Sequence, residues 1–262
     1  MRRCGAWGLV LGLVCLLISE PVSCSVTVFL GPDGTDGDSC GQVGQEPCAT
    51  LAYILAMQTP QQPNLTVVVL PGRYSGSGFA NLSVTMGQLI IRPAPGSIGN
   101  ITFDLLFAPD TSFMAISGAS TIVSLTSLQF TNSANGFLTV NQGAVLQSTQ
   151  VVFKSSSGAS AVIMSMSTGS FQVCSTFLFF LSIFSFFHFL LCIFLLCLNK
   201  DSGFMNCTNN AGNGGAMFIS NSDPSLELCS FTGCSSEMGG AVFVSNPQVT
   251  SAPVFNDVLF QS

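Results

Sequence analysis

The residues best suited to chemistry in this chain are three carboxylates near its N-terminal end. Asp33, Asp36 and Asp38 lie within six residues, a density that could converge on a hard cation such as Ca²⁺. The run lacks the bidentate Glu that closes a calcium loop, and Asp and Gly at this density typically form consecutive turns. We therefore predict turns here, with no metal site and no bound cofactor.

Acids and bases are sparse in the middle of the chain, where an enzyme acting on polysaccharide would need them. Residues 75–172 contain two acids, Asp104 and Asp110, and two bases, Arg92 and Lys154. Glycoside hydrolysis uses a pair of carboxylates, and proton abstraction needs a positioned base. Because no such group stands out, we predict no catalytic residues and favour a protein that is not an enzyme.

Five of the 11 cysteines lie outside residues 1–24 and 173–200. Cys40 and Cys48 flank a seven-residue loop, and in an oxidising compartment this spacing favours a disulfide over a metal pair. Cys207 and Cys234 hold the same place in two copies of a repeat, so they could form a disulfide or simply stack as small apolar residues.

The first 24 residues have the pattern of a secretory signal peptide. Arg2 and Arg3 form a basic start, Leu9–Ile18 form an apolar centre, and small residues at Ser23–Ser25 suit cleavage. This pattern predicts an extracellular or cell-surface protein.

Secretion exposes asparagine sequons to glycosylation. Each sequon alone is a weak signal, because turn asparagines are also common in such chains. The four acceptor candidates are Asn64, Asn81, Asn100 and Asn206.

A phenylalanine-centred repeat runs through most of the chain. Each copy ends a short apolar strand at a Phe and continues into a polar turn rich in Gly, Asn and Ser. The repeated residues are Phe130, Phe153, Phe204, Phe231 and Phe260, separated by 23, 51, 27 and 29 residues. Short β-rich units of this period predict a parallel β-helix, in which each rung covers the open edge of the one before.

A hydrophobic run, Phe177–Leu198, interrupts this repeat. It is long and apolar enough for a transmembrane helix, and we expect it to form a helix if translated. The residue types in this run can all have pyrimidine-rich codons, as in the tract that precedes a splice acceptor. A second interpretation is therefore that Val173–Lys200 are encoded by a retained intron. Removing these 28 residues would shorten the 51-residue separation to 23 and keep the reading frame.

Two segments carry a family resemblance. Residues 26–84 resemble the N-terminal cap and first rung of right-handed parallel β-helix proteins of the pectin-lyase-like class. The motifs GGAMF at 214–218 and GGAVF at 239–243 resemble the repeats of chlamydial polymorphic outer membrane proteins. The family's Phe-x-x-Asn motif is altered at its last position here, to Cys207 and Cys234. The resemblance implies an all-β, right-handed parallel β-helix, while Thr50–Met57 has the spacing of a short capping helix.

The predicted organisation follows from these segments. We expect a signal peptide at 1–24, a cap and first rungs at 25–172, the hydrophobic insert at 173–200, and further repeats at 201–262 that belong to a longer repeat protein. The formal charge of −6 offers no basic patch for nucleic acid.

The functional prediction is a secreted or surface-displayed, non-catalytic module for adhesion, matrix or recognition, with carbohydrate or a cell-surface protein as partner. Arg73 and Arg92 could contact a carbohydrate or carboxylate, although a solvated role is the simpler interpretation. One alternative is a polysaccharide lyase or hydrolase whose catalytic rungs lie outside this sequence. The other is a single-pass membrane protein anchored by residues 177–198, the only case in which we expect membrane contact.

Overall fold

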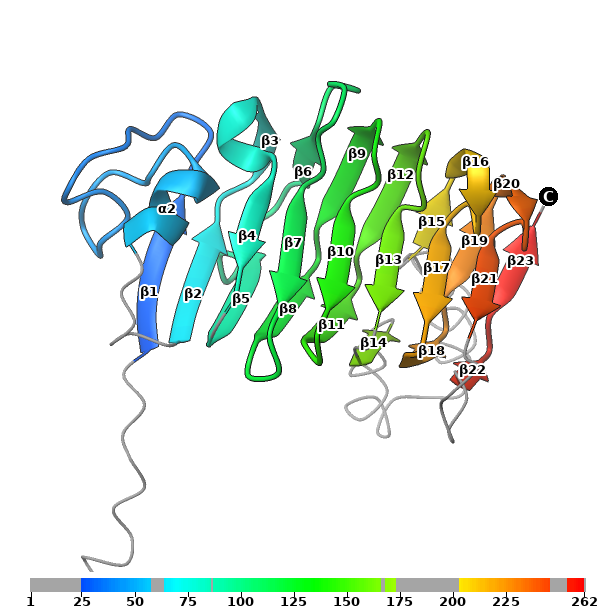
Figure 1. The fold of residues 1–262 in the computed structure, drawn as a ribbon. Helices are drawn as coiled ribbons and strands as arrows, with labels where there is room; N and C mark the ends of the chain where they lie inside the picture. The colour runs from blue at the N-terminus through cyan, green and yellow to red at the C-terminus, as the bar shows by residue number, and fades with distance from the viewer. Residues whose placement is uncertain are drawn as a thin grey trace, which may run out of the picture.

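The computed structural model describes residues 25–57, 64–85, 87–165, 168–172, 203–245 and 254–261. These residues form parallel sheets with little helix, so the prediction of an all-β parallel fold is confirmed. Successive passes of the chain visit an eight-, a seven- and a six-stranded sheet in the same order (Figure 1). We call one such pass a rung.

Each of the three large sheets contains strands from successive rungs, side by side in chain order. The eight-stranded sheet contains β1 (Ser25–Leu30), β2 (Asn64–Val69), β5 (Gln88–Pro93), β8 (Ile122–Thr126), β11 (Val145–Thr149), β14 (Thr168–Gln172), β18 (Asp223–Glu227) and β22 (Val254–Asn256). The seven-stranded sheet contains β3 (Gly72–Ser75), β6 (Ile101–Asp104), β9 (Gln129–Ser133), β12 (Val152–Ser156), β15 (Gly203–Met205), β19 (Ser230–Thr232) and β23 (Leu259–Gln261). The six-stranded sheet contains β4 (Leu82–Val84), β7 (Met114–Ser117), β10 (Leu138–Asn141), β13 (Val162–Ser165), β17 (Met217–Ser220) and β21 (Val242–Ser245). A two-stranded sheet contains β16 (Thr208–Asn213) and β20 (Ser235–Met238).

An aromatic stack runs through the core along the seven-stranded sheet. Residues at equivalent inward positions pair in register from rung to rung, with ring centroids between 4.8 and 5.4 Å apart. The stack contains Tyr74, Phe103, Phe130, Phe153, Phe204, Phe231 and Phe260. The five predicted Phe residues are therefore confirmed as equivalent, and Phe153 lies directly opposite Phe204 despite the insert between them.

Short corners lead from the eight-stranded to the seven-stranded sheet. Two residues separate β8 from β9, β11 from β12, β18 from β19 and β22 from β23. The first residue of these four corners has a left-handed backbone, at Ser127 (φ 52), Gln150 (φ 55), Leu228 (φ 53) and Asp257 (φ 50), whereas the two-residue corner between β2 and β3 begins at Leu70 without a positive φ. The second residue points inward and is buried or packed against the core, at Leu128, Val151, Cys229 and Val258.

The N-terminal end of the stack is covered by α2 (Leu51–Met57), as predicted for residues 50–57 (Figure 1). Leu51 and Ile54 on this helix are buried in the core, and the short 3-10 helix η1 (Ser77–Phe79) contacts it. Covering this end removes an open edge that would otherwise recruit another strand.

Two predicted segments lie outside the described residues, the signal peptide at 1–24 and the insert at 173–200 with its expected helix. Within the part of the chain that the structure describes, no helix is long and apolar enough to cross a membrane.

Candidate functional site

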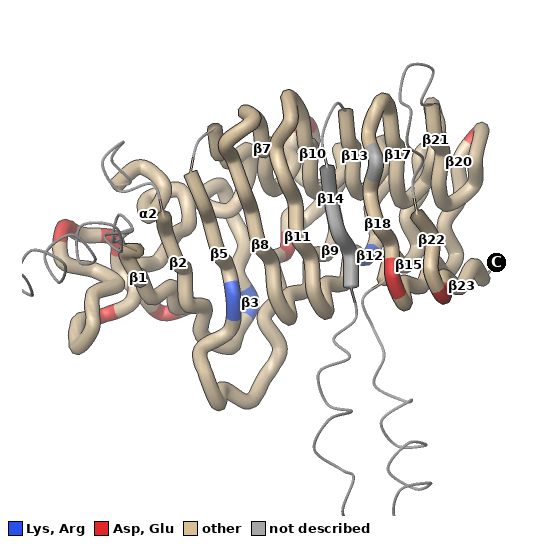
Figure 2. The backbone as a smooth tube through the Cα atoms, turned by 90° about the horizontal axis from the view of Figure 1, so that it is seen from below, with Lys and Arg blue, Asp and Glu red and all other residues tan. Residues whose placement is uncertain are grey.

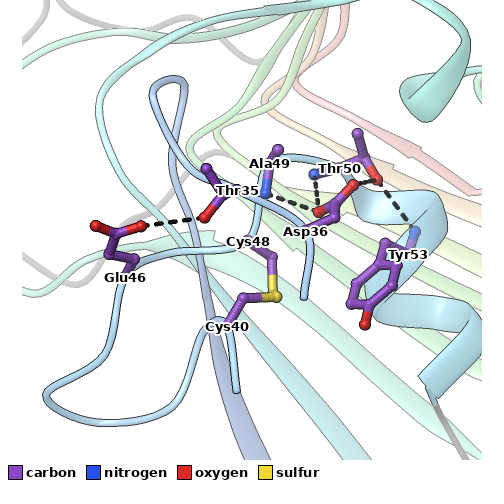
Figure 3. The surroundings of a disulfide bond; sticks show 8 residues. All are labelled: Thr35, Asp36, Cys40, Glu46, Cys48, Ala49, Thr50 and Tyr53. Atoms are coloured by element: carbon purple, nitrogen blue, oxygen red, sulfur yellow. Dashed lines mark hydrogen bonds between the residues drawn. A yellow bond between two sulfur atoms is a disulfide. The ribbon is translucent and has the colours of Figure 1, made fainter. Parts of the chain in front are cut away.

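The acidic run at Asp36 serves to begin the capping helix (Figure 3). The Asp36 carboxylate accepts hydrogen bonds from the backbone N–H groups of Ala49 and Thr50, at 2.9 and 3.0 Å, and from the Thr50 hydroxyl at 2.7 Å. The Thr50 hydroxyl oxygen in turn accepts the Tyr53 N–H, as an N-cap residue does. Asp33 and Asp38 lie in turns.

Cys40 and Cys48, the pair predicted from the sequence, are joined by a disulfide beside Asp36, with Cα atoms 4.9 Å apart (Figure 3). Together with Asp36 they are the only group of potential metal ligands among the described residues. Metal coordination requires thiolates, whereas both sulfurs are oxidised and the carboxylate already accepts hydrogen bonds from Thr50, the N-cap residue of α2. This cluster therefore stabilises the cap.

A polar groove lies on the outer face of the seven-stranded sheet, across β3, β6, β9 and β12. It encloses about 470 Å³, a volume within the usual range for ligand sites. Hydroxyl and amide groups line much of it, from Asn100, Thr102, Gln129, Thr131 and Ser155.

Asp104 is the single carboxylate in the groove lining, and three neighbours hold it in place. Arg73 forms an ion pair with its Oδ2, Asn132 Nδ2 lies 3.1 Å from both carboxylate oxygens, and the Leu106 N–H donates at 2.8 Å. Burial raises the pKa of the Asp104 carboxyl, but the hydrogen bonds from Leu106, Asn132 and Arg73 outweigh burial and lower the pKa below its usual value. Asp104 is therefore ionised and fully engaged at neutral pH.

Two basic residues, Arg73 and Lys154, line the groove. The Arg73 side chain is 63% exposed despite its ion pair. Lys154 lies two strands from Asp104, since Thr131 pairs with both of them. Within the described residues no ion pair joins Lys154 to a carboxylate. Figure 2 shows these basic positions at β3 and β12, with Arg92 of β5 outside the groove lining.

The sequence analysis named Arg73, Asp104 and Lys154 singly, and it did not predict that they lie in one groove. Asn132 was missed. The feature that could have identified it is its position two residues after the repeated Phe130. The backbone there is left-handed (φ 60), a conformation that Asn accepts more readily than most residues. The next rung has Ser155 at the same place, also with φ 60, and this residue also lines the groove.

The remaining predicted sites are distributed along the fold. Cys207 and Cys234 are thiols without a disulfide, at neighbouring positions in the ladder. Of the sequon asparagines, Asn81, Asn100 and Asn206 are exposed, whereas Asn64 is half-buried in β2. Their glycosylation stays a prediction.

Among solved structures, the chain is similar to a rhamnogalacturonan lyase, with a TM-score of 0.36 and 13% sequence identity over 90% of this chain. It spans 66% of the lyase chain, just under two thirds. No protein-family model matches the chain, and no curated protein does. The parallel sheets fit the predicted parallel β-helix, whereas no finding connects the chain with chlamydial polymorphic outer membrane proteins.

Proposed function

We propose that this protein is a secreted or surface-displayed module of the right-handed parallel β-helix class that binds an acidic polysaccharide without cleaving it. The groove on the seven-stranded sheet carries this proposal, because two cations flank one carboxylate that is already fully hydrogen-bonded. The constant order in which the chain visits three parallel sheets supports the solenoid class.

The groove chemistry favours an anionic sugar chain. Lys154 lacks a carboxylate partner among the described residues, and Arg73 is exposed enough to offer further N–H donors to a ligand. The surrounding hydroxyl and amide groups can exchange hydrogen bonds with sugar hydroxyls. Arg73 and Lys154 are three strands apart, roughly 15 Å, which suits an extended oligosaccharide better than one small molecule.

The same residues argue for binding over hydrolysis. Hydrolysis of a glycosidic bond uses two carboxylates, one of which must be protonated to act as an acid. The groove lining contributes only Asp104, whose lowered pKa keeps it ionised. Asp104 is committed to Arg73 and Asn132, so its role is to hold the groove in shape.

The test is calorimetric titration of the full chain with an oligogalacturonate at low ionic strength. We expect Lys154→Gln to weaken binding about tenfold, which corresponds to about 1.4 kcal/mol. Arg92→Gln is the matched control, because it removes an exposed cation outside the groove and should leave affinity nearly unchanged. A neutral β-glucan oligosaccharide should bind far more weakly.

Equal losses in both variants would show only non-specific charge attraction and would overturn the groove assignment. Product analysis of the same mixtures addresses the enzyme alternative. Shortened oligosaccharides that vanish in Lys154→Gln would replace the binding proposal with a carbohydrate-active one.

A further inference from the structure

Cys207 and Cys234 occupy the same position in two successive rungs of the seven-stranded side. The strands before them are in register, with Phe204 opposite Phe231, and β16 begins opposite β20 directly after them. The Ser235 N–H donates to the Cys207 carbonyl at 2.9 Å, which fixes the two backbones side by side. Adjacent strands lie about 4.8 Å apart, within the Cα separations of about 4.4–6.8 Å that disulfides span.

The two thiols differ in exposure and interact with each other. Cys207 is fully buried, whereas Cys234 is only partly buried and its sulfur lies 3.5 Å from the Phe204 carbonyl oxygen. The hydrogen bond from Cys207 lowers the pKa of Cys234 to about 7, despite the opposing effect of burial. The same contact, together with burial, raises the pKa of Cys207. One thiol is therefore accessible and readily ionised, and the other is held protonated beside it.

We propose that Cys234 and Cys207 are a thiol–disulfide exchange pair that closes into a disulfide between rungs when the protein meets a small-molecule disulfide. The Cys234 thiolate attacks one sulfur of the oxidant, forming a mixed disulfide and releasing the other half as a thiolate. Cys207 then loses its proton to that thiolate or to water and attacks the Cys234 sulfur, which releases the second half. Two protein thiols are oxidised to one disulfide, and the external disulfide is reduced to two thiols.

Closure would tie together two rungs on the C-terminal side of the insert. The linked residues are 27 positions apart, so the bond restricts the unfolded chain over that loop. We expect the midpoint of thermal unfolding to rise by about 10 °C on closure. The cap already contains a comparable covalent link, between Cys40 and Cys48.

The experiment exposes the reduced full chain to graded ratios of oxidised and reduced glutathione, followed by digestion without reductant. Proteases that cut after Glu227 and Phe231 place Cys207, Cys229 and Cys234 on separate peptides, which mass spectrometry can distinguish. Wild-type protein should yield a peptide pair linked through Cys207 and Cys234. The variant Cys207→Ser should stop at a glutathione adduct on Cys234.

Cys229→Ser is the matched control, since Cys229 is a buried thiol two residues before the repeated Phe231, and closure should be unchanged. The pH dependence of Cys234 alkylation gives a second readout that a purely structural role would not move. Wild-type alkylation should be half-maximal near pH 7, and Cys207→Ala, which removes the donor, should shift that point upward by about one unit or more, whereas Cys207→Ser keeps a hydroxyl donor and should shift it less. A stable glutathione adduct on Cys234 in wild-type protein, or a link to Cys229, would overturn the proposal.

Discussion

The corner between β14 and β15 can be compared with the five two-residue corners at the same edge of the fold. Two residues are enough between β8 and β9, or between β11 and β12, whereas 30 residues lie between Gln172 and Gly203. The strands on both sides nevertheless keep the common register. β14 pairs with β11 and β18, and β15 pairs with β12 and β19. The ends of β14 and β15 thus have the same neighbours as ordinary corner ends.

Removing residues 173–200 leaves two residues at this corner, Asp201 and Ser202. The first residue of the short corners after β8, β11, β18 and β22 is left-handed, a conformation in which Asp is enriched, and Asp257 occupies that place in a later rung. We propose that Asp201 and Ser202 complete the rung, and that residues 173–200 are encoded by a retained intron rather than by the mature message.

The pairing also bears on the membrane alternative. Strands before the insert hydrogen-bond directly to strands after it in all three large sheets, at β12 with β15, β13 with β17 and β14 with β18. A single membrane pass at 177–198 would place these partners on opposite sides of a bilayer. The observed ladder is incompatible with that topology.

The largest expected change in the free energy of unfolding is at Phe204, in the first rung after the insert, and it tests whether the rungs on both sides of the insert share one core. Phe204→Ala removes a ring that stacks between Phe153 and Phe231 with 2% exposure, and should lower the free energy of unfolding by about 3–5 kcal/mol. Chemical denaturation provides the measurement. Phe218→Ala, which removes a half-buried ring on the outer face, is the control and should cost about 1 kcal/mol. Equal, small losses would mean that the rungs beyond the insert are not part of the same cooperative core.

The continuity of this stack could be predicted from the sequence because one inward position per rung is aromatic and its spacing is regular. Phe130, Phe153 and Phe204 were enough to place the rungs across the insert. Tyr74 and Phe103 were not recognised as members, because Tyr74 is not a Phe and Phe103 is followed by Asp-Leu-Leu instead of a polar turn rich in Gly, Asn and Ser.

The groove could not be predicted in the same way. Arg73 and Asp104 are 31 residues apart and Asn132 is a further 28, so their contact depends on the register of three outward-facing strand positions. Core positions reveal themselves through hydrophobic periodicity, whereas outward polar residues follow no such period. The disulfide between Cys40 and Cys48 was accessible from the sequence because it closes a short local loop.

The next effect is stabilisation on deleting residues 173–200. Shortening the corner from 30 residues to two reduces the loop-closure entropy, so the deletion should raise the free energy of unfolding by about 2 kcal/mol. Urea denaturation of both chains gives the value, and the m-value should change little. Deleting residues 173–201 as a control removes one residue more and leaves a single residue between Gln172 and Gly203, so this chain should be less stable than the 28-residue deletion. Transcript sequencing across the codons for Gln172 and Asp201 tests the intron itself, and transcripts that retain the 84 nucleotides would refute it.

A smaller effect, at Asp201, should differ between the full chain and the chain that lacks residues 173–200. In the deleted chain this residue should take the left-handed corner conformation, which a β-branched side chain resists. Asp201→Val should therefore cost about 1–2 kcal/mol in the deleted chain and almost nothing in the full chain. Asp201→Gly, which tolerates that backbone, should cost little in either. A cost from Asp201→Val that is the same in both chains would contradict the assignment of Asp201 to the corner.

The smallest expected effect concerns Ser202, the second corner residue. Its counterparts Leu128, Val151 and Cys229 are buried, so a hydroxyl in the same place would be an exception among apolar neighbours. Ser202→Val should stabilise the deleted chain by about 1 kcal/mol, because it places apolar surface against the core where a polar group stood. The full chain should be unaffected, since there Ser202 is not constrained by a two-residue connection. Stabilisation of both chains by the same amount would show that Ser202 lies against the core regardless of the insert, and the difference between the two corners would then rest on length alone.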